Sequence, residues 1–298
     1  MFTPDFVKKG DKIAIVSTAR KIDFKEVKEA IDLLETWGLQ PVLGSTIGSQ
    51  DHQFAGSDQL RRADFQKMLD DNDIKAIWCA RGGYGTVRII DDIDFSGFRQ
   101  KPKWIIGYSD ITVLHSHIHN FEINTIHAPM PVDVHKGTKA SIDSLKEVIF
   151  GNREGYTISS SKKNVLGQAQ GQLIGGNLSM LYSLCGSKSA LDTKGKILCI
   201  EDLDEYLYHI DRMLQNLRRN GYFDHLSGLI VGGMTKMHDN NVPFGKKAKK
   251  IILDIVKDYD FPVAFNFPMG HIEDNRAFIF GAEVSLKVDE EGVVFKYL

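Results

Sequence analysis

The sequence is poor in cysteine, has no long apolar run and carries almost no net charge. Its three cysteines, Cys79, Cys185 and Cys199, lie in apolar surroundings without C-x-x-C spacing, so they predict buried side chains, not disulfides or zinc ligands. The formal charge of −2 gives no electrostatic case for binding nucleic acid or an anionic membrane. No segment reaches a membrane-spanning length, and the first residues lack a signal-peptide core, so we expect a cytoplasmic protein.

The 298 residues, of which 42% are hydrophobic, suffice for two modest domains or one large one. Apolar segments alternate with segments of helical periodicity along the first 120 or so positions. This alternation predicts a parallel sheet wound by helices. The expected strands span 12–17, 41–43, 75–80 and 104–106, and the expected helices span 24–37, 58–70, 86–91 and 110–119.

Residues 151–169 interrupt this alternation. The segment is polar, with three consecutive serines and two lysines, which is typical of a connector between domains. We therefore expect an N-terminal α/β domain over 1–152, a linker over 153–169 and a C-terminal domain over 170–298. In the C-terminal domain we expect a segment at 171–184 that is glycine-rich and then helical, and a second helix at 206–219. The expected strands span 196–200, 229–231, 263–267 and 278–280. The segments 284–288 and 293–297 are expected to form a closing hairpin.

Ser109 directly follows a strand-like segment in the stretch WIIGYSD, residues 104–110. The apolar run stops at a glycine, and an apparent helix begins at Asp110. Such a strand, turn and helix are typical of a nucleophile elbow, which holds a hydroxyl beside helix N–H groups that can stabilise an oxyanion. The full G-x-S-x-G pattern is absent, because Ile111 occupies the second glycine position. The alternative is an ordinary turn or N-capping serine.

A nucleophilic serine needs a base, and the base needs an acceptor that holds its tautomer. His271 is the best placed of ten histidines, since it lies beyond the apolar segment 263–267 and open α/β sheets bind ligands at the carboxyl ends of strands. Glu201 ends another apolar segment and is a candidate acceptor for the Nδ1–H of His271. Alternatively, Glu201 is one of four solvated loop acids, with Asp202, Asp204 and Glu205.

The turn RGGYG at residues 81–85 lies between an expected strand and an expected helix. Its glycines would let backbone N–H groups approach an anion, so one interpretation is a phosphate cradle, although neither common phosphate-binding pattern is present. A second interpretation is an oxyanion hole, with the N–H of Gly83 directed at the carbonyl that Ser109 attacks. The third is a tight turn without chemical function.

His115 and His119 are four residues apart on an expected helix, which is the spacing of helical zinc sites. Position 116 is a serine, where the H-E-x-x-H motif of zinc peptidases has glutamate. No third ligand is apparent, so the pattern favours a surface or half-buried histidine face over a metal site.

Six short segments occur together over nearly the whole chain. They are FAG at 54–56, ARGGYG at 80–85, GYSD at 107–110, GGNL at 175–178, IED at 200–202 with the RML helix at 212–214, and GH at 270–271. Each is weakly specific alone, but their joint occurrence in this order resembles the LD-carboxypeptidases. This family of serine peptidases includes the murein tetrapeptide carboxypeptidases and, as cousins, the microcin-immunity peptidases.

The resemblance implies a triad of Ser109, His271 and Glu201, and an oxyanion hole formed by the main-chain N–H groups of Gly83 and Asp110. It implies a flavodoxin-like N-terminal α/β domain with the nucleophile and a smaller C-terminal α/β domain with its partners, so that the site sits at the domain interface. It also implies a homodimer and catalysis without cofactor or metal. One departure is Ser17-Thr18-Ala19, where many members carry proline in the middle; this turn holds no triad residue.

The expected function is therefore that of a cytoplasmic serine carboxypeptidase, which cleaves the amide before a C-terminal D-amino acid. Its expected partner is a small muropeptide, processed from tetrapeptide to tripeptide in cell-wall recycling. The chain lacks an evident long insertion for nucleotide-peptide recognition, which favours this branch over the microcin-immunity type. A different serine hydrolase and a non-catalytic protein whose two lobes bind an anionic ligand are also compatible with the sequence.

Overall fold

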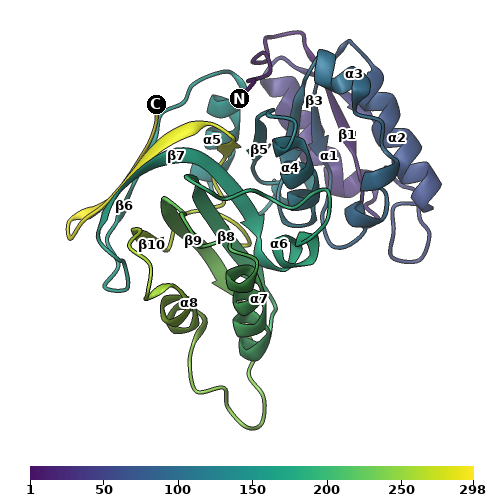
Figure 1. The fold of residues 1–298 in the computed structure, drawn as a ribbon. Coiled ribbons are helices and arrows are strands. Elements are labelled where there is room, and N and C mark those ends of the chain that lie inside the picture. The colour runs from purple at the N-terminus through teal and green to yellow at the C-terminus, as the bar shows by residue number, and fades with distance from the viewer. The chain divides into compact units, whose positions relative to one another are not determined.

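A computed structural model describes all residues from Met1 to Leu298. The chain divides into two compact units (Figure 1). Unit 1 consists of residues 1–152 and 273–279, and unit 2 consists of residues 153–272 and 280–298. None of the helices combines the length and the hydrophobicity that crossing a membrane requires.

The sheet of unit 1 has six strands in the order β11-β5-β4-β3-β1-β2. Strands β1 to β5 pair in parallel, in the order 2-1-3-4-5 of flavodoxin-like folds, which confirms the expected fold class. The strands are β1 (Lys12–Val16), β2 (Gln40–Leu43), β3 (Ile74–Cys79), β4 (Trp104–Gly107), β5 (Thr125–His127) and β11 (Phe278–Phe280).

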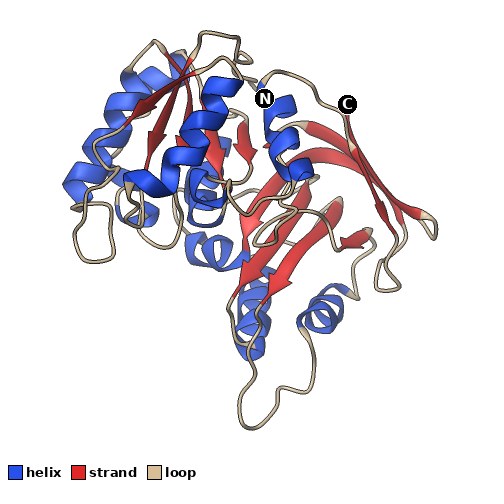
Figure 2. Ribbon diagram, turned by 180° about the vertical axis from the view of Figure 1, so that it is seen from behind, coloured by secondary structure: helices blue, strands red, loops and turns tan.

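Helices lie along both sides of this sheet (Figure 2). They are α1 (Phe24–Thr36), α2 (Asp58–Asp70), α3 (Ser96–Gln100), α4 (Thr112–His119) and α5 (Lys139–Ile149). Side-chain caps begin two of them: Ser57 Oγ accepts from the backbone N–H of Leu60 at 3.2 Å, and Thr138 Oγ1 accepts from that of Ser141 at 3.1 Å. The expected helix at 86–91 is wrong, because that segment forms two 3₁₀ turns that are too short to propagate an α-helix.

The sheet of unit 2 is mixed, with the order β10-β9-β8-β7-β12-β13-β6. Strands β7 to β10 pair in parallel, whereas β12 and β13 form the expected antiparallel hairpin. The strands are β6 (Tyr156–Ser159), β7 (Gly167–Asn177), β8 (Ile197–Leu203), β9 (Gly228–Thr235), β10 (Val263–Phe265), β12 (Glu283–Val288) and β13 (Gly292–Tyr297). The segment 153–169, expected as a linker, contains β6 and the first residues of β7.

Three helices belong to unit 2: α6 (Leu178–Leu184), α7 (Leu207–Arg219) and α8 (Ala248–Val256). Helices α7 and α8 lie beside β8, β9 and β10 (Figure 1). Both present a continuous apolar face to the core, where each fully buried Leu or Ile contributes about 1.5–3 kcal/mol. This packing supports the carboxyl ends of the parallel strands: the candidate acid lies near the end of β8, and the candidate base follows β10.

Candidate active site

Ser109 begins a 3₁₀ turn that connects β4 to α4. Its φ of +62° lies in the left-handed region, which costs a non-glycine residue about 1–2 kcal/mol and is often found at functional sites. A Cβ atom at Gly107 would lie 2.9 Å from Ile111 Cγ1, so glycine lets the new helix fold back against the strand end. The turn therefore has the backbone geometry of a nucleophile elbow.

The RGGYG turn after β3 contacts this serine. A Cβ atom at Gly82 would lie 3.3 Å from Ser109 Oγ and 3.3 Å from the backbone N of Asp110. The space that a side chain would fill at Gly82 is thus bounded by the hydroxyl and by an N–H group. Gly83, the next residue of the turn, has a φ of +106° and lies against Arg20, where a Cβ atom would come within 2.9 Å of Cδ.

The Asp110 side chain fastens this turn to the elbow. It is 1% exposed, and its Oδ2 accepts a hydrogen bond from the backbone N–H of Thr86 at 2.9 Å. Burial raises the pKa of Asp110, while hydrogen bonds from Thr86 and Gly85 partly oppose the shift. Its backbone nitrogen lies beside the space at Gly82, and its side chain anchors the neighbouring turn.

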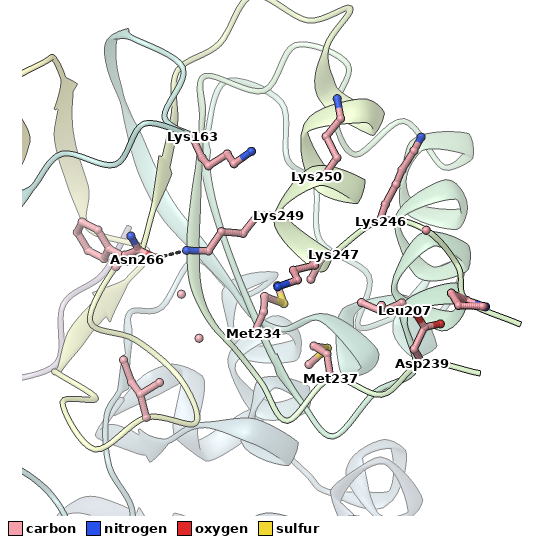
Figure 3. Close-up of a pocket in the computed structure, with 17 residues that line it drawn as sticks. Lys163, Leu207, Met234, Met237, Asp239, Lys246, Lys247, Lys249, Lys250 and Asn266 are labelled. Carbon is pink, nitrogen blue, oxygen red and sulfur yellow. Dashed lines mark hydrogen bonds between the residues drawn. The ribbon is translucent and has the colours of Figure 1, made fainter. Parts of the chain in front are cut away.

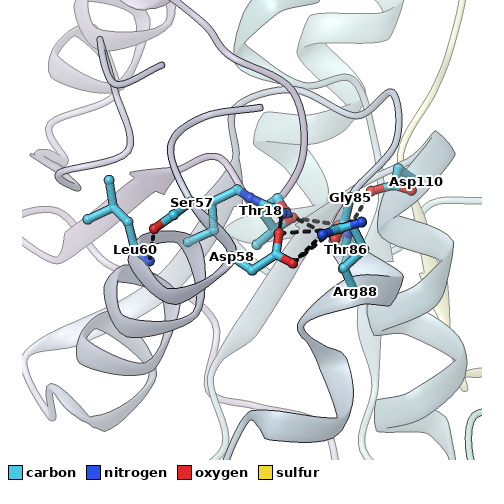
Figure 4. A network of polar contacts seen from close by, with 9 residues as sticks. Thr18, Ser57, Asp58, Leu60, Gly85, Thr86, Arg88 and Asp110 are labelled. Atoms are coloured by element: carbon cyan, nitrogen blue, oxygen red, sulfur yellow. Dashed lines mark hydrogen bonds and ion pairs between the residues drawn. The ribbon is translucent and has the colours of Figure 1, made fainter. Parts of the chain in front are cut away.

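A buried arginine joins the same turn to the loop after β1, and its partners Thr18, Asp58 and Gly85 are labelled in Figure 4. Arg61 of α2 is fully buried and donates from Nη1 to the carbonyl oxygens of Thr18 and, at 2.9 Å, of Gly85. Its Nη2 pairs with Asp58. Thr18 Oγ1 lies 2.8 Å from Thr86 Oγ1. Sequence reasoning missed Arg61, because its carbonyl partners become neighbours only after folding.

In unit 2, Glu201 is fully buried near the end of β8. Its Oε2 lies 2.7 Å from His271 Nδ1 and accepts from the backbone N–H of His271 at 3.2 Å. Its Oε1 accepts from Asn177 Nδ2 at 3.3 Å. Glu201 is therefore no solvated loop acid. It holds an imidazole that is 17% exposed, with Nδ1 in contact with the carboxylate, which fixes the orientation of the ring.

Two glycines provide the space for this carboxylate. Gly270 has a φ of +92°, and a Cβ atom there would lie 2.3 Å from Glu201 Oε2. A Cβ atom at Gly232 would lie 3.2 Å from Glu201 Cβ and 2.5 Å from the carbonyl oxygen of Met269. A side chain at position 270 would collide with the Glu201 carboxylate. The glycine before His271 is therefore needed for the contact between Glu201 and His271.

Asp202 forms a second layer behind Glu201. Its carboxylate accepts from Asn177 Nδ2 at 3.0 Å, from the backbone N–H of Ser179 at 3.0 Å and from that of Leu203 at 2.8 Å. Burial raises the pKa of Asp202 to about 7, and the charge of Glu201 adds to the shift. Asn177 bridges the two carboxylates, which is a connection that sequence spacing does not reveal.

The His115 ring has a structural role that excludes it as a metal ligand in this conformation. Its Nδ1 lies 2.8 Å from Thr125 Oγ1, and its Nε2 lies 2.9 Å from the carbonyl oxygen of Gly107, which requires Nε2 to be the donor. Burial lowers the pKa of His115 to about 3, so the ring is neutral. His119 is also buried, and no group of three or more His, Cys, Asp or Glu side chains in the chain is arranged to hold a metal.

Ser109 at a strained strand-to-helix turn in unit 1, and His271 held by a buried carboxylate in unit 2, are the parts that serine hydrolases use. Together with the two-unit α/β fold, they indicate the hydrolase class, and the match to known families identifies the protein as a peptidase. The chain belongs to the LD-carboxypeptidase family: residues 13–128 match its N-terminal domain and residues 170–286 match its C-terminal domain.

Relatives agree with this assignment. A probable murein peptide carboxypeptidase of Bacillus subtilis is 38% identical over 307 aligned positions, covering 99% of this chain and 94% of that protein. The crystal structure of a muramoyltetrapeptide carboxypeptidase from Oxalobacter formigenes has a TM-score of 0.88 at 23% identity, covering 96% and 98% of the two chains. The microcin C7 self immunity protein MccF has a TM-score of 0.88 at 20% identity, covering 99% and 98%, and shares the fold.

Proposed function

We propose that the protein is a serine carboxypeptidase that removes the terminal D-amino acid from murein tetrapeptides in cell-wall recycling. The contact between Glu201 Oε2 and His271 Nδ1, at 2.7 Å, carries the proposal, because it orients a general base. The relative from Bacillus subtilis, named for murein peptides, supports this substrate class. The likeness to MccF concerns the fold alone, so the microcin-immunity activity is an outcome of the tests below.

In the proposed mechanism, Ser109 Oγ attacks the scissile carbonyl while His271 Nε2 accepts its proton. Glu201 keeps the imidazole in the productive tautomer and stabilises its cation. The backbone N–H groups of Gly83 and Asp110 donate to the oxyanion. The protonated His271 then gives its proton to the leaving amine, and water hydrolyses the acyl-enzyme by the same route in reverse.

We also propose that the protein acts in the cytoplasm as a homodimer, with a small peptide as its partner and neither nucleic acid nor membrane. The resemblance to the family supports the homodimer and the peptide partner. Sedimentation velocity over a hundredfold range of concentration tests the dimer, and fractionation of the host cell tests the location. A fully active monomer at every concentration would remove the dimer from the proposal.

A fluorophosphonate probe tests the nucleophile. We expect the wild-type protein to be labelled and Ser109→Ala to remain unlabelled, because the probe reacts only with an activated hydroxyl. Labelling should also be lost in His271→Ala. Ser183→Ala, which removes an exposed hydroxyl on α6, is the matched control and should label fully. Full labelling of Ser109→Ala would place the nucleophile elsewhere.

Two epimeric peptides test the substrate. L-Ala-D-Glu-meso-diaminopimelyl-D-Ala should lose its last residue, and the epimer ending in L-Ala should react at least about a hundredfold more slowly, since its carboxylate would take the place of the methyl group and misalign the carbonyl. Comparable rates would remove the LD specificity and leave a serine hydrolase. Cleavage of an aminoacyl sulfamoyl nucleoside, with neither peptide cleaved, would favour the microcin-immunity alternative.

A further inference from the structure

Unit 2 contains a cavity of about 1280 Å³ beside α8 and the carboxyl ends of β9 and β10 (Figure 3). Its volume exceeds that of most small-ligand sites, which measure about 300–1,000 Å³. The apolar part of its lining includes Leu207, Met234, Met237, Phe267 and Ile272. The cationic part consists of five lysines, Lys163, Lys246, Lys247, Lys249 and Lys250.

The lysines fall into two groups according to their partners. Lys246 and Lys250 both pair with Asp254, at 2.8 Å and 2.6 Å. Lys163, Lys247 and Lys249 form no ion pair with the protein's own carboxylates. We call these last three the unpaired lysines of the cavity.

Lys249 shows that the unpaired lysines lack a counter-charge. Its Nζ donates to the neutral amide oxygen of Asn266 (Figure 3), and burial together with the charge of Lys163 lowers the pKa of Lys249. Asp239, the acid in the lining, lies away from Lys163 and Lys249, and its Oδ1 accepts from the backbone N–H groups of Asn240 and Phe244 at 2.9 Å each. An anion in the cavity would offset the repulsion that the protein leaves uncompensated.

The backbone around the cavity agrees with an anion site. Helix α8 begins there, Lys247 is its N-cap residue, and no side chain caps its first N–H groups. Asn266, the partner of Lys249, has a φ of +63°, in the left-handed region that asparagine adopts more readily than most residues. The side-chain oxygen of Asn266 accepts the hydrogen bond from Lys249 Nζ.

The cavity also adjoins the loop that carries the proposed base. Ile272 of its lining follows His271 directly, and Gly232 of its lining lies against Glu201. Thr235 Oγ1 donates to the carbonyl oxygen of His271 at 3.1 Å. A ligand in the cavity is therefore close in unit 2 to the acid–base pair, without overlapping it.

We propose that this cavity is a substrate subsite that binds the side-chain and backbone carboxylates of an acidic peptide. The inference rests on the proposed function, which supplies a peptide with several carboxylates. The unpaired lysines and the start of α8 would bind the charged groups. The apolar lining would contact the methylene and methyl groups between them, and the volume suits several residues.

The test replaces the unpaired lysines together, as Lys163→Gln, Lys247→Gln and Lys249→Gln in one variant. We expect KM for the acidic tetrapeptide to rise about tenfold with kcat within about twofold of wild type, because the ground state and the transition state lose the same charge pairs with the substrate carboxylates. The matched control combines Lys194→Gln, Lys257→Gln and Lys296→Gln, which removes the same charge from exposed sites of unit 2 outside the cavity. An equal rise in the control, or an unchanged KM in the cavity variant, would overturn the subsite.

A second arm uses a peptide in which the glutamyl carboxylate is replaced by a carboxamide. Wild type should bind it more weakly, whereas the cavity variant should not distinguish the two peptides, which gives a double-mutant cycle. Calorimetry in the Ser109→Ala background separates binding from turnover. If wild type cleaves no tetrapeptide, the proposed function fails, and calorimetry still decides the subsite: loss of binding in the cavity variant supports it, and equal binding overturns it.

Discussion

Glycines at three positions set the space around Ser109 and Glu201, two residues of the proposed triad. Gly82 leaves room beside the Ser109 hydroxyl and the Asp110 N–H, while Gly232 and Gly270 leave room for the Glu201 carboxylate. Replacing each glycine by alanine therefore tests a different part of the proposed mechanism. Of the three, Gly270 alone has a positive φ, so alanine strains the backbone there and not at Gly82 or Gly232.

Gly82→Ala should lower kcat on the order of 10²-fold while the melting temperature changes little. The added Cβ would occupy the space bounded by Ser109 Oγ and the Asp110 N–H, where the oxyanion is proposed to form, and Gly82 does not have a left-handed backbone. Peptide hydrolysis and a thermal melt measure the two effects. Full activity in this variant would move the oxyanion away from Gly82.

Gly270→Ala should abolish activity and lower stability, because its Cβ would lie 2.3 Å from Glu201 Oε2 in a left-handed conformation. Gly186→Ala is the matched control, since Gly186 also has a positive φ, +78°, but nothing lies within 4 Å of its Cβ position. We expect the control to cost about 1–2 kcal/mol of unfolding free energy and to keep its kcat. Equal kcat losses in both variants would contradict a steric role for Gly270.

Asp202 should make the stability depend on pH. Its folded pKa of about 7 lies above the ordinary value of 3.8, so the folded state binds a proton more tightly and the unfolding free energy falls as pH rises from about 4 to 7. Asp202→Asn should remove this fall, which is on the order of 3 kcal/mol. Denaturant unfolding at pH 4.5 and pH 8 measures it, with the exposed Asp258→Asn as control. Parallel pH profiles for wild type and Asp202→Asn would show that Asp202 ionises normally.

At the scale of elements, local signals predict those whose partners are nearby in sequence. Helix α1 begins at a capping box of Asp23 and Glu26 and buries Val27, Ala30 and Leu34, so its periodicity is visible in the sequence. The sequence does not predict helix α5, because Ser141 and Ser144 occupy its buried face and interrupt the apolar periodicity. Both hydroxyls bond to the backbone of residues 275 and 277.

The same distinction applies to the candidate site. Ser109, Glu201 and His271 each follow or end an apolar strand, and the RGGYG turn follows another, so position along a strand was enough to name them. Whether the three act together stays a prediction. The buried Arg61, by contrast, lies on a helix whose sequence is mostly polar, and its carbonyl partners are 24 and 43 residues away. Such contacts follow from the fold and have no local signal.

Arg61→Ala should destabilise the loops that Arg61 joins. It leaves the buried carbonyl oxygens of Thr18 and Gly85 without their donor, for which we expect a loss of about 3–5 kcal/mol in unfolding free energy. Arg62→Ala, one residue further along α2 and half-buried without an ion pair, is the control and should cost less than about 1 kcal/mol. Denaturant unfolding measures both. Equal losses of unfolding free energy in the two variants would mean that the hydrogen bonds of Arg61 do not stabilise the protein.

At the scale of the molecule, unit 1 is made from two separate stretches of chain. Residues 273–279 return to it after the whole parallel part of unit 2, and Ser141 Oγ donates to the carbonyl oxygen of Asn275 at 2.6 Å. The apolar run at 278–280 predicted a strand. Nothing local indicates which sheet such a strand joins, so its place beside β5 is visible only in the structure.

A fragment of residues 1–152 should therefore be less stable than the same fragment fused through a Gly/Ser linker to residues 273–279. The fusion restores part of β11 beside β5 and the hydrogen bond that the backbone N–H of Ala277 donates to Ser144 Oγ, at 2.9 Å. Thermal unfolding followed by circular dichroism measures the difference, with a scrambled 273–279 segment as control. Identical melting of all three would mean that unit 1 is complete without the returning stretch.

This return of the chain has a consequence for synthesis on the ribosome. Unit 1 cannot finish its sheet until residues 273–279 have been made, and translating the roughly 120 residues that come between takes on the order of 10 s. During that interval the nascent chain holds the Ser109 loop on a sheet with an open edge at β5, which invites pairing with another chain. By the time the edge closes, Glu201 and His271 have both been synthesised. The sheet that carries Ser109 is therefore completed only after the residues proposed to act with it have been made.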